Sequence, residues 1–326
     1  MIGQGGLSPR DEKLRRLLEA MRRHLGDLGR FLVEPDVSEI MRNPDGTVWI
    51  DRAGVPMAMV GTLSDEATEA FIAVVASMQR AVVNHNAPRL KGRLPLDGSR
   101  FQFWLPPLSV APSFSIRRHS SVVFPLTDYE ARGIMAAAQR REIERAIDGR
   151  LNIIVSGGTL SGKTTLLNAC LLYRAETAPH LRQFVLEDTP ELRVKSPNFV
   201  SLCTDEDAGV TMRTLVQDAL RGRPDCIIVG ESRSGDAMLE TLKSWNTGHD
   251  GGMSTVHANS TEQTLTRIED LLLEVSPTPL CRLIADAINL IVHIQHDSRL
   301  PAGRRITEVL AIKGWRDGEY QAERLA

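Results

Sequence analysis

The clearest chemical signal in the chain is one run of eight residues that matches the phosphate-binding pattern G-x-x-x-x-G-K-[ST]. The run reads Gly157-Gly158-Thr159-Leu160-Ser161-Gly162-Lys163-Thr164. In a loop of this kind, backbone N–H groups and the N-terminus of the next helix face the phosphates of a nucleoside triphosphate. The lysine reaches the β- and γ-phosphates, and the threonine hydroxyl ligates Mg²⁺. The sequence therefore predicts an ATP site from Gly157 to Thr165, with Lys163 and Thr164 in these two roles.

The residues on either side of this run have the character that a phosphate loop requires. Residues 151–156 form a short and mostly apolar stretch, which is typical of a buried parallel strand, and residues 165–172 are typical of a helix. The alternative is a glycine-rich surface turn, which needs neither neighbour. The order of strand, loop and helix favours the phosphate site over that alternative.

Acidic residues and a histidine follow three further predicted strands. They are Glu187, Asp188 and Glu191 after the first strand, Glu231 after the second, and His257 after the third. A triphosphatase needs metal ligands and a group that positions or deprotonates water, and both usually lie at strand ends near the phosphate loop. Any one of these residues alone is more typical of a helix cap, a solvated turn or a structural histidine. Their joint occurrence after a phosphate loop favours a triphosphatase.

Composition predicts two globular domains and argues against several kinds of partner. The chain has 326 residues, 42% of them hydrophobic and 25% charged, which is enough to bury two cores. Its formal net charge of −2 creates no overall field for polyanions, so we expect no direct binding of nucleic acid. No stretch reaches the roughly 18 continuous apolar residues of a membrane span, so we expect only peripheral membrane contact, through a partner. The four scattered cysteines are typical of thiols in a reducing cytosol.

The elements that must position the candidate residues fall into two regions, of which the first ends near residue 120. Helices are predicted to begin at Ser8 and Ser64, and strands are predicted at 47–50, 100–105 and 113–117. Helices and strands are therefore mixed without a regular alternation. We expect residues 1–120 to form a smaller α+β domain.

The second region carries the phosphate loop and is predicted to be an α/β domain. Residues 121–131 are predicted to link the domains, because a capping box at Thr127 to Glu130 opens a new helical region there. In residues 132–326, helical segments alternate with apolar strand candidates. These candidates are 151–156, 183–187, 226–229, 253–256 and 290–294. The alternation predicts a mainly parallel sheet that helices cover on both faces.

Further short motifs accompany the phosphate loop in a fixed order between residues 43 and 259. They are Asn43-Pro44-Asp45-Gly46 with Trp49, Pro95 to Phe101, Ala111 to Arg117, Leu186 to Leu192, Arg223-Pro224-Asp225 before Val229-Gly230-Glu231, Trp245 to Gly252, and Ser254 to Asn259. In this order the motifs resemble those of the secretion ATPases of type II and type IV systems, and most closely the TrbB-like conjugal transfer ATPases. The resemblance covers nearly the whole chain and implies a RecA-like P-loop NTPase fold for the second domain.

The resemblance also implies roles for the residues that match the family's motifs. Glu187, Asp188 and Glu191 fall in its acidic box, whose carboxylates help to hold Mg²⁺ and its waters. Glu231 occupies the atypical Walker B position, which implies that it orients or deprotonates the attacking water. His257 lies in the histidine box, which implies a hydrogen bond to the γ-phosphate. With Lys163, these residues form the expected catalytic centre.

Two arginines of the first domain belong to the same expected site. Arg100 and Arg117 match arginines of the family that approach the triphosphate when domains or subunits close. A guanidinium in that place stabilises the charge of the transition state. The alternative for both residues is a surface salt bridge.

The resemblance further implies a cellular setting. The family forms homo-hexameric rings in the cytoplasm, peripherally associated with the inner membrane. The expected partners are therefore the inner-membrane and coupling components of a type IV secretion or conjugation apparatus. ATP turnover is expected to power the assembly of a channel or pilus and the transfer of substrate.

The sequence departs from the family's pattern in two places. Leu160 stands where the family has glycine, at a position that commonly has a positive φ, which costs a leucine on the order of 1–2 kcal/mol. After Glu231, the family's Glu-Val-Arg-Gly-Pro-Glu is replaced by a segment that keeps only the glutamate and the arginine, Arg233. Leu160 leaves open a second function, a nucleotide-gated assembly scaffold with weak hydrolysis. A DNA-translocating ATPase is a third function, which the near-neutral charge disfavours.

Overall fold

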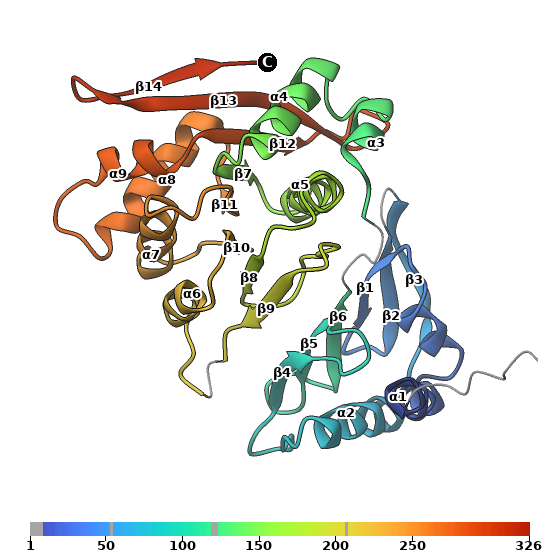
Figure 1. Cartoon of the computed structure of the whole chain (residues 1–326). Helices are drawn as coiled ribbons and strands as arrows, with labels where there is room; N and C mark the ends of the chain where they lie inside the picture. Colours follow the sequence, from blue (N-terminus) through green and yellow to red (C-terminus); the bar gives the residue numbers. More distant parts are fainter. Residues whose placement is uncertain (1–8, 53–54, 119–122, 206–207) are drawn as a thin grey trace, which may run out of the picture. The chain divides into compact units, whose positions relative to one another are not determined.

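The computed structural model of the protein describes residues 9–52, 55–118, 123–205 and 208–326. The chain divides into two compact units, Met1–Val122 and Val123–Ala326, which Figure 1 draws in blue to cyan and in green to red. Each unit has a sheet and a buried apolar core of its own. None of the helices in the described ranges combines the length and the hydropathy needed to cross a bilayer.

The first unit is an antiparallel sheet covered by helices, as expected for an α+β domain. Its sheet has the order β3-β2-β1-β6-β5-β4, and every pairing in it is antiparallel. The strands are β1 (Val37–Arg42), β2 (Thr47–Arg52), β3 (Val55–Thr62), β4 (Arg89–Arg93), β5 (Arg100–Trp104) and β6 (Ser113–Arg117). The helices are α1 (Pro9–Leu25), the 3₁₀ helix η1 (Gly26–Leu32) and α2 (Asp65–Met78).

The core of the first unit forms because alternate strand residues face the helices. In β5, Phe101 and Phe103 are buried and their neighbours are half-buried, which is the period-2 pattern of a strand with one covered face. Phe103 and Phe114 of β6 contact Phe71 of α2 with ring centroids 5.8 Å and 5.4 Å from it. Figure 1 shows α1 and α2 side by side on this sheet. Ser8, the predicted cap of α1, lies outside the described residues.

The second unit contains the predicted mainly parallel sheet, extended at one edge by an antiparallel hairpin. The sheet has the order β14-β13-β12-β7-β11-β10-β8-β9. Its strands are β7 (Ile153–Gly157), β8 (Gln183–Glu187), β9 (Phe199–Cys203), β10 (Cys226–Val229), β11 (Met253–His257), β12 (Leu290–His296), β13 (Arg304–Arg316) and β14 (Glu319–Arg324). The strands from β12 to β9 are parallel, and β13 and β14 are antiparallel to their neighbours.

Helices cover both faces of this sheet, which explains why its central strands are apolar throughout. The helices are α3 (Leu126–Ala131), α4 (Ala137–Asp148), α5 (Lys163–Thr177), α6 (Met212–Arg221), α7 (Gly235–Trp245), α8 (Thr261–Leu273) and α9 (Cys281–Ala287). In β7, Ile153 and Val155 belong to the core with α4 and α5, whereas Ile154 belongs to the core with α7, α8 and α9. Figure 1 shows these two groups of helices on opposite sides of the strands.

The start of the second unit differs from the sequence-based expectation. Residues 126–131 of the predicted linker form α3, and its Leu126 and Tyr129 are buried in the core of the second unit. The predicted capping box at Thr127 is wrong, because the N-cap of α3 is Pro125, two residues earlier, and it has no side-chain cap. Proline has no hydroxyl to accept from the first turn, and its ring fixes its φ near the observed −67°, so the helix starts without a side-chain cap. Residues 119–122, which include the start of the predicted linker, lie outside the described residues.

The parallel pairing brings the ends of four strands to one edge of the sheet. His257, the last residue of β11, is in register with Gly157, the last residue of β7. On the other side of β11, Val229 of β10 is in register with Leu186 of β8, one residue before Glu187. Because ligands of open α/β sheets bind beyond the carboxyl ends of the strands, this edge is where a site is expected.

Candidate active site

The phosphate loop joins β7 to α5 and is shaped by two of its glycines. Gly157 lies so close to the carbonyl oxygen of Ile294 in β12 that a β-carbon there would clash with it. Gly162 is the N-cap of α5 and has a φ of 99°, which glycine adopts without steric cost. The loop therefore ends directly at the helix N-terminus, where backbone N–H groups are free of intrahelical partners. This is the geometry of an anion site.

Lys163 is held against this loop by three hydrogen-bond contacts. Its Nζ donates to the carbonyl oxygens of Gly157 at 3.0 Å and Gly158 at 2.8 Å. Nζ also lies 3.2 Å from Nδ1 of His257, at the end of the neighbouring strand. The lysine is 7% exposed, so its charge is fixed at the mouth of the loop. The structure thus brings the predicted phosphate-binding lysine and the predicted histidine together.

Glu231 and Arg233 extend this contact into a series of four side chains. Nε2 of His257 lies 3.0 Å from Oε1 of Glu231, and Oε2 of Glu231 accepts from Nη2 of Arg233 at 2.6 Å. Because an ammonium group only donates, Nδ1 of His257 accepts from Lys163 and Nε2 carries the proton that is donated to Glu231. We call Lys163, His257, Glu231 and Arg233 the hydrogen-bonded series. It links the phosphate loop to the predicted catalytic carboxylate.

The charges around the series fix its protonation. Burial raises the pKa of Glu231, but the hydrogen bond from Arg233 and the positive charges of Arg233 and Lys163 outweigh it, so the pKa lies below its ordinary value. Burial and the charge of Lys163 lower the pKa of His257. At neutral pH, Glu231 is therefore an ionised acceptor and His257 is neutral. An ionised carboxylate is the form that can accept a proton from water.

Glu187 is the most buried carboxylate of the acidic box. It is 3% exposed, and its Oε1 accepts hydrogen bonds from the backbone N–H groups of Glu191 at 2.8 Å and Leu192 at 2.9 Å. Among the described residues, its buried Oε2 has no hydrogen-bond partner. Burial raises the pKa of Glu187 to about 6 in spite of the two N–H donors. Gly230 lies against this side chain, since a β-carbon there would come within 2.9 Å of Cγ of Glu187.

The raised pKa of Glu187 predicts a pH dependence of stability. Because its pKa rises from 4.5 to about 6 on folding, the stabilisation is complete below pH 4.5 and is lost as the pH rises through 6. A rise of this size corresponds to about 2 kcal/mol. We expect the free energy of unfolding, measured by urea titration, to fall by about this amount relative to Glu187→Gln between pH 4.5 and about pH 7. A difference that stays constant over this range would contradict the assignment.

Of the other predicted metal ligands, Asp188 and Glu191 lie beside Glu187 along the chain, but the set does not form a complete metal site. Asp188 accepts from Oγ1 of Thr204 at 3.2 Å, and Thr164 lies in the first turn of α5. In the part of the chain that the structure describes, no group of three or more His, Cys, Asp or Glu side chains is arranged to hold a metal ion. Protein sites commonly bind Mg²⁺ through one or two carboxylates together with substrate phosphates. The predicted ligands, including Glu191, fit that mode better than a metal site made of protein ligands alone.

Leu160 has the positive φ that its place in the loop predicts. Its φ is 61°, and its side chain is 69% exposed. A left-handed backbone costs a leucine on the order of 1–2 kcal/mol. This cost belongs to the folded loop itself, so it lowers the stability of the protein. The exposed side chain does not press against the rest of the loop.

Replacing Leu160 is therefore expected to change stability. Leu160→Gly relieves the strain but increases the entropy of the unfolded chain, which leaves a net gain of up to about 1 kcal/mol. We expect the Tm to rise by about 2–4 °C in thermal unfolding. Leu160→Ala is the matched control, since alanine keeps the penalty for positive φ and should give no such gain. Equal gains in both variants would show that the side chain, and not the backbone, causes the strain.

Arg304 is a candidate residue that the sequence did not indicate. It begins β13, and its guanidinium lies so close to Gly162 that a β-carbon there would contact it. The arginine therefore adds a positive charge beside the N-terminus of α5. It follows Lys163 by more than a hundred residues and reaches the loop only because β13 pairs with β12 and β12 with β7. No local motif marks it.

Arg100 and Arg117 lie in the first unit and are directly opposite each other on β5 and β6. Nε of Arg117 is 3.8 Å from Oε1 of Glu39, which is its register partner on β1. This contact is the surface salt bridge that the sequence left as an alternative for Arg117. Both arginines therefore belong to a different unit from the phosphate loop, and none of the contacts described above for the candidate site involves them.

Comparison with known proteins identifies the family. A family model described as "Type II/IV secretion system protein" matches residues 24–308. The chain belongs to this family. In this type II/IV secretion system protein, the matched residues span both units, from the end of α1 into β13.

Relatives of this secretion protein carry names that agree with the resemblance seen in the motifs. The chain is 43% identical over 309 residues to a "Probable conjugal transfer protein TrbB" of Sinorhizobium fredii, covering 94% of this chain and 93% of that protein. It is 42% identical over 312 residues to a "Conjugal transfer protein TrbB" of Rhizobium radiobacter, covering 95% of each. The predicted TrbB-like membership is confirmed.

Solved structures that resemble this secretion protein confirm the fold. The pilus retraction motor PilT with bound ADP has a TM-score of 0.60 at 17% identity, covering 95% of this chain and 81% of that one. The ATPase DotB of Legionella pneumophila has a TM-score of 0.57 at 17% identity, covering 99% and 82%. Together with the mainly parallel sheet, these likenesses confirm the predicted RecA-like second unit after a smaller α+β unit.

Proposed function

We propose that this protein hydrolyses ATP and that the turnover powers a type IV secretion or conjugative transfer apparatus. The observation that carries the proposal is the hydrogen-bonded series, which joins the phosphate-loop lysine to an ionised carboxylate through one neutral histidine. In such a series, only His257 separates the proton acceptor Glu231 from the lysine that binds the phosphates. Family membership supports the ATPase assignment.

The residues of the loop fit a bound triphosphate. Ser161 Oγ is buried and, among the described residues, has no hydrogen-bond partner, so it can serve a phosphate oxygen. Lys163, the next residue, and Arg304 both supply positive charge near Gly162. We infer that residues 157–165 bind the phosphates. Thr164 and the acidic box would hold Mg²⁺, which when bound neutralises charge on the phosphates.

The hydrolytic step is assigned to Glu231. Its carboxylate accepts the proton of the attacking water, and Arg233 and His257 hold it in place by occupying one oxygen each. His257 is assigned to the γ-phosphate. Because Lys163 and Glu231 occupy both of its ring nitrogens, its single N–H would be exchanged from Glu231 to the phosphate when the triphosphate binds. Positioning and electrostatic stabilisation account for most of phosphoryl-transfer catalysis, so these fixed contacts are the relevant ones.

Arg100 and Arg117 are proposed to complete the site when domains or subunits close. Like charges directly opposite each other in a sheet repel, which is a cost that an anion between them would remove. A triphosphate is an anion of that kind. The Glu39 contact of Arg117, at 3.8 Å with the arginine 48% exposed, is weak enough to exchange for a phosphate.

The cellular role follows from the relatives. We propose a homo-hexameric ring in the cytoplasm, peripherally associated with the inner membrane, that acts on inner-membrane and coupling components of a conjugation apparatus. The names of the TrbB relatives and of the "Type IV secretion system protein PtlH" of Bordetella pertussis, 28% identical over 330 residues, support it. The net charge of −2 supports the absence of direct nucleic acid binding.

A combined measurement separates this function from the two alternatives. We would measure nucleotide affinity, phosphate release and sedimentation on the same purified protein. A motor binds ATP and releases phosphate continuously. Tight binding and ring formation with negligible phosphate release would favour the scaffold that Leu160 leaves open. Stimulation of phosphate release by single- or double-stranded DNA would favour a DNA translocase.

A further inference from the structure

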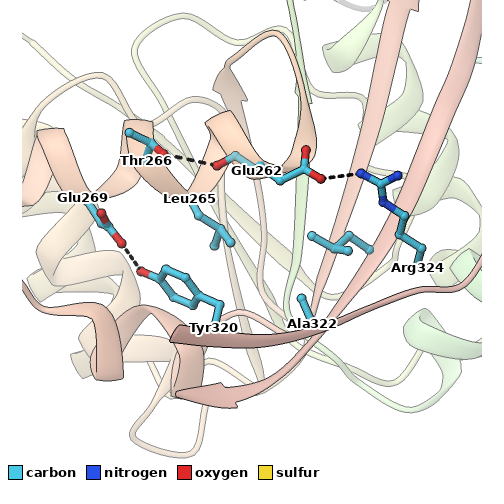
Figure 2. A pocket seen from close by; sticks show the side chains of 8 residues that line it. Glu262, Leu265, Thr266, Glu269, Tyr320, Ala322 and Arg324 are labelled. Atoms are coloured by element: carbon cyan, nitrogen blue, oxygen red, sulfur yellow. Dashed lines mark hydrogen bonds and ion pairs between the residues drawn. The ribbon is translucent and has the colours of Figure 1, made fainter. Parts of the chain in front are cut away.

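A cavity of about 540 Å³ lies between α8 and the β13–β14 hairpin of the second unit (Figure 2). The residues that line it are Glu262, Leu265, Thr266, Glu269, Leu310, Tyr320, Ala322 and Arg324. Leu265 and Leu310 are 7% and 4% exposed and form its apolar floor. The cavity combines this floor with carboxylates from α8, so it fits a side chain that has an aliphatic stem and a charged end.

At one end of the cavity, the arginine is already paired within the protein. Arg324 donates from Nη2 to Oε1 of Glu262 at 2.5 Å, as Figure 2 shows, and it also contacts Glu308. Thr261 hydrogen-bonds to the same Glu308. Arg324 is therefore shared between two carboxylates, so its charge would not repel a cation that enters the cavity.

The other end carries a carboxylate that no cation neutralises. Oε1 of Glu269 accepts from the hydroxyl of Tyr320 at 2.6 Å and from Sγ of Cys281 at 3.5 Å, and both donors are neutral. Among the described residues, no lysine, arginine or histidine forms an ion pair with Glu269. Burial and the hydrogen bond to Glu269 raise the pKa of Tyr320, so the hydroxyl stays protonated and remains a donor. The cavity wall therefore holds a net negative charge.

An exposed strand edge runs beside this cavity. β14 is the outermost strand of the eight-stranded sheet among the described residues, so one side of its backbone is open to pairing. Tyr320, Ala322 and Arg324 alternate along β14, and all three line the cavity (Figure 2). Because side chains of a strand alternate between faces, every second side chain of a strand added at this edge would lie beside the cavity.

We propose that the β14 edge and this cavity form a docking site for an extended segment of a partner protein that carries a lysine or an arginine. The segment pairs with β14 through its backbone. Its basic side chain enters the cavity, with the aliphatic stem on Leu265 and Leu310 and the cation at Glu269. The proposal is independent of ATP hydrolysis.

Binding of short strand-forming peptides tests this proposal. The probes are heptapeptides, Thr-Val-Thr-X-Thr-Val-Thr-amide, that carry fluorescein on the N-terminal amine, with X as arginine, lysine, norleucine or glutamate. The readout is fluorescence anisotropy with the full chain. We expect the arginine and lysine peptides to bind at least about tenfold more tightly than the other two, because a charge-assisted contact is gained. Failure of the wild-type protein to bind the basic peptides, or equal binding of all four, would overturn the proposal.

Two variants locate the binding site. Glu269→Gln keeps the size of the side chain and removes its charge, so the tenfold preference should disappear. Asp270→Asn is the matched control, because it removes an exposed charge one residue away that does not line the cavity. Equal effects of the two substitutions would mean a general electrostatic attraction and would overturn the site. Methylation of alternate backbone nitrogens in the arginine peptide should abolish binding only in the register that pairs with β14.

Discussion

Lys163→Ala is expected to reduce ATP hydrolysis by about 10²- to 10³-fold, which is the usual effect of removing one preorganised donor from a phosphoryl-transfer site. The structure gives the physical reason. The ammonium group is fixed by two loop carbonyls at the N-terminus of α5, where the triphosphate charge is expected. Alanine removes this charge and also the donor to Nδ1 of His257. Steady-state phosphate release at saturating MgATP is the measurement.

The matched control for this variant is Lys195→Ala. Lys195 is an exposed lysine of the same unit, outside the phosphate loop, so the substitution changes the net charge equally. We expect its phosphate release to stay within about twofold of the wild-type rate, because exposed charges away from the site have small effects. If the two variants lost activity equally, the loop lysine would have no specific role.

Glu231→Gln is expected to lower kcat by about 10²- to 10⁴-fold and to change nucleotide affinity by only a few-fold. General base catalysis contributes a factor of this size, and glutamine removes the base while it keeps an acceptor for Arg233 or His257. A fall in kcat without a loss of binding marks an interaction made in the transition state. Phosphate release and nucleotide titration on the same preparation measure the two quantities.

Asp236→Asn serves as the control for Glu231→Gln. Asp236 is an exposed carboxylate in the first turn of α7, and its contact to Arg213 is long, at 3.9 Å. Its removal should leave kcat nearly unchanged. A loss of kcat in Glu231→Gln no larger than in this control would remove Glu231 from the catalytic role and leave His257 as the candidate that remains.

The central strands could be predicted from the sequence because their apolar runs are continuous. Residues 226–229 became β10 with the predicted bounds, since a strand buried on both faces needs apolar residues at every position. The β13–β14 hairpin was not predicted, because charged residues interrupt its apolar pattern. A local signal was present in Asp317-Gly318, whose φ values of 55° and 82° are those of a hairpin turn.

The candidate site could be predicted in its residue types but not in its contacts. The phosphate loop, Glu231 and His257 are each marked by their place after a strand. The contact of Lys163 with His257 depends on the register of β11 against β7, which no local pattern encodes. For the same reason Arg304, which reaches the loop through two strand pairings, has no sequence signal. The positive φ of Leu160 was predicted from the glycine that the family has at this position, and it could be predicted because backbone sterics are local.

The most direct test of the ATPase assignment is steady-state phosphate release by the unmodified protein, measured beside Lys163→Ala and Leu160→Gly at the same oligomer concentration. We predict that the unmodified protein exceeds Lys163→Ala by at least about 100-fold, with Leu160→Gly close to the unmodified rate. Phosphate release no faster than that of Lys163→Ala would contradict the account. If only Leu160→Gly then released phosphate, the chain would be a regulatory scaffold and not a motor.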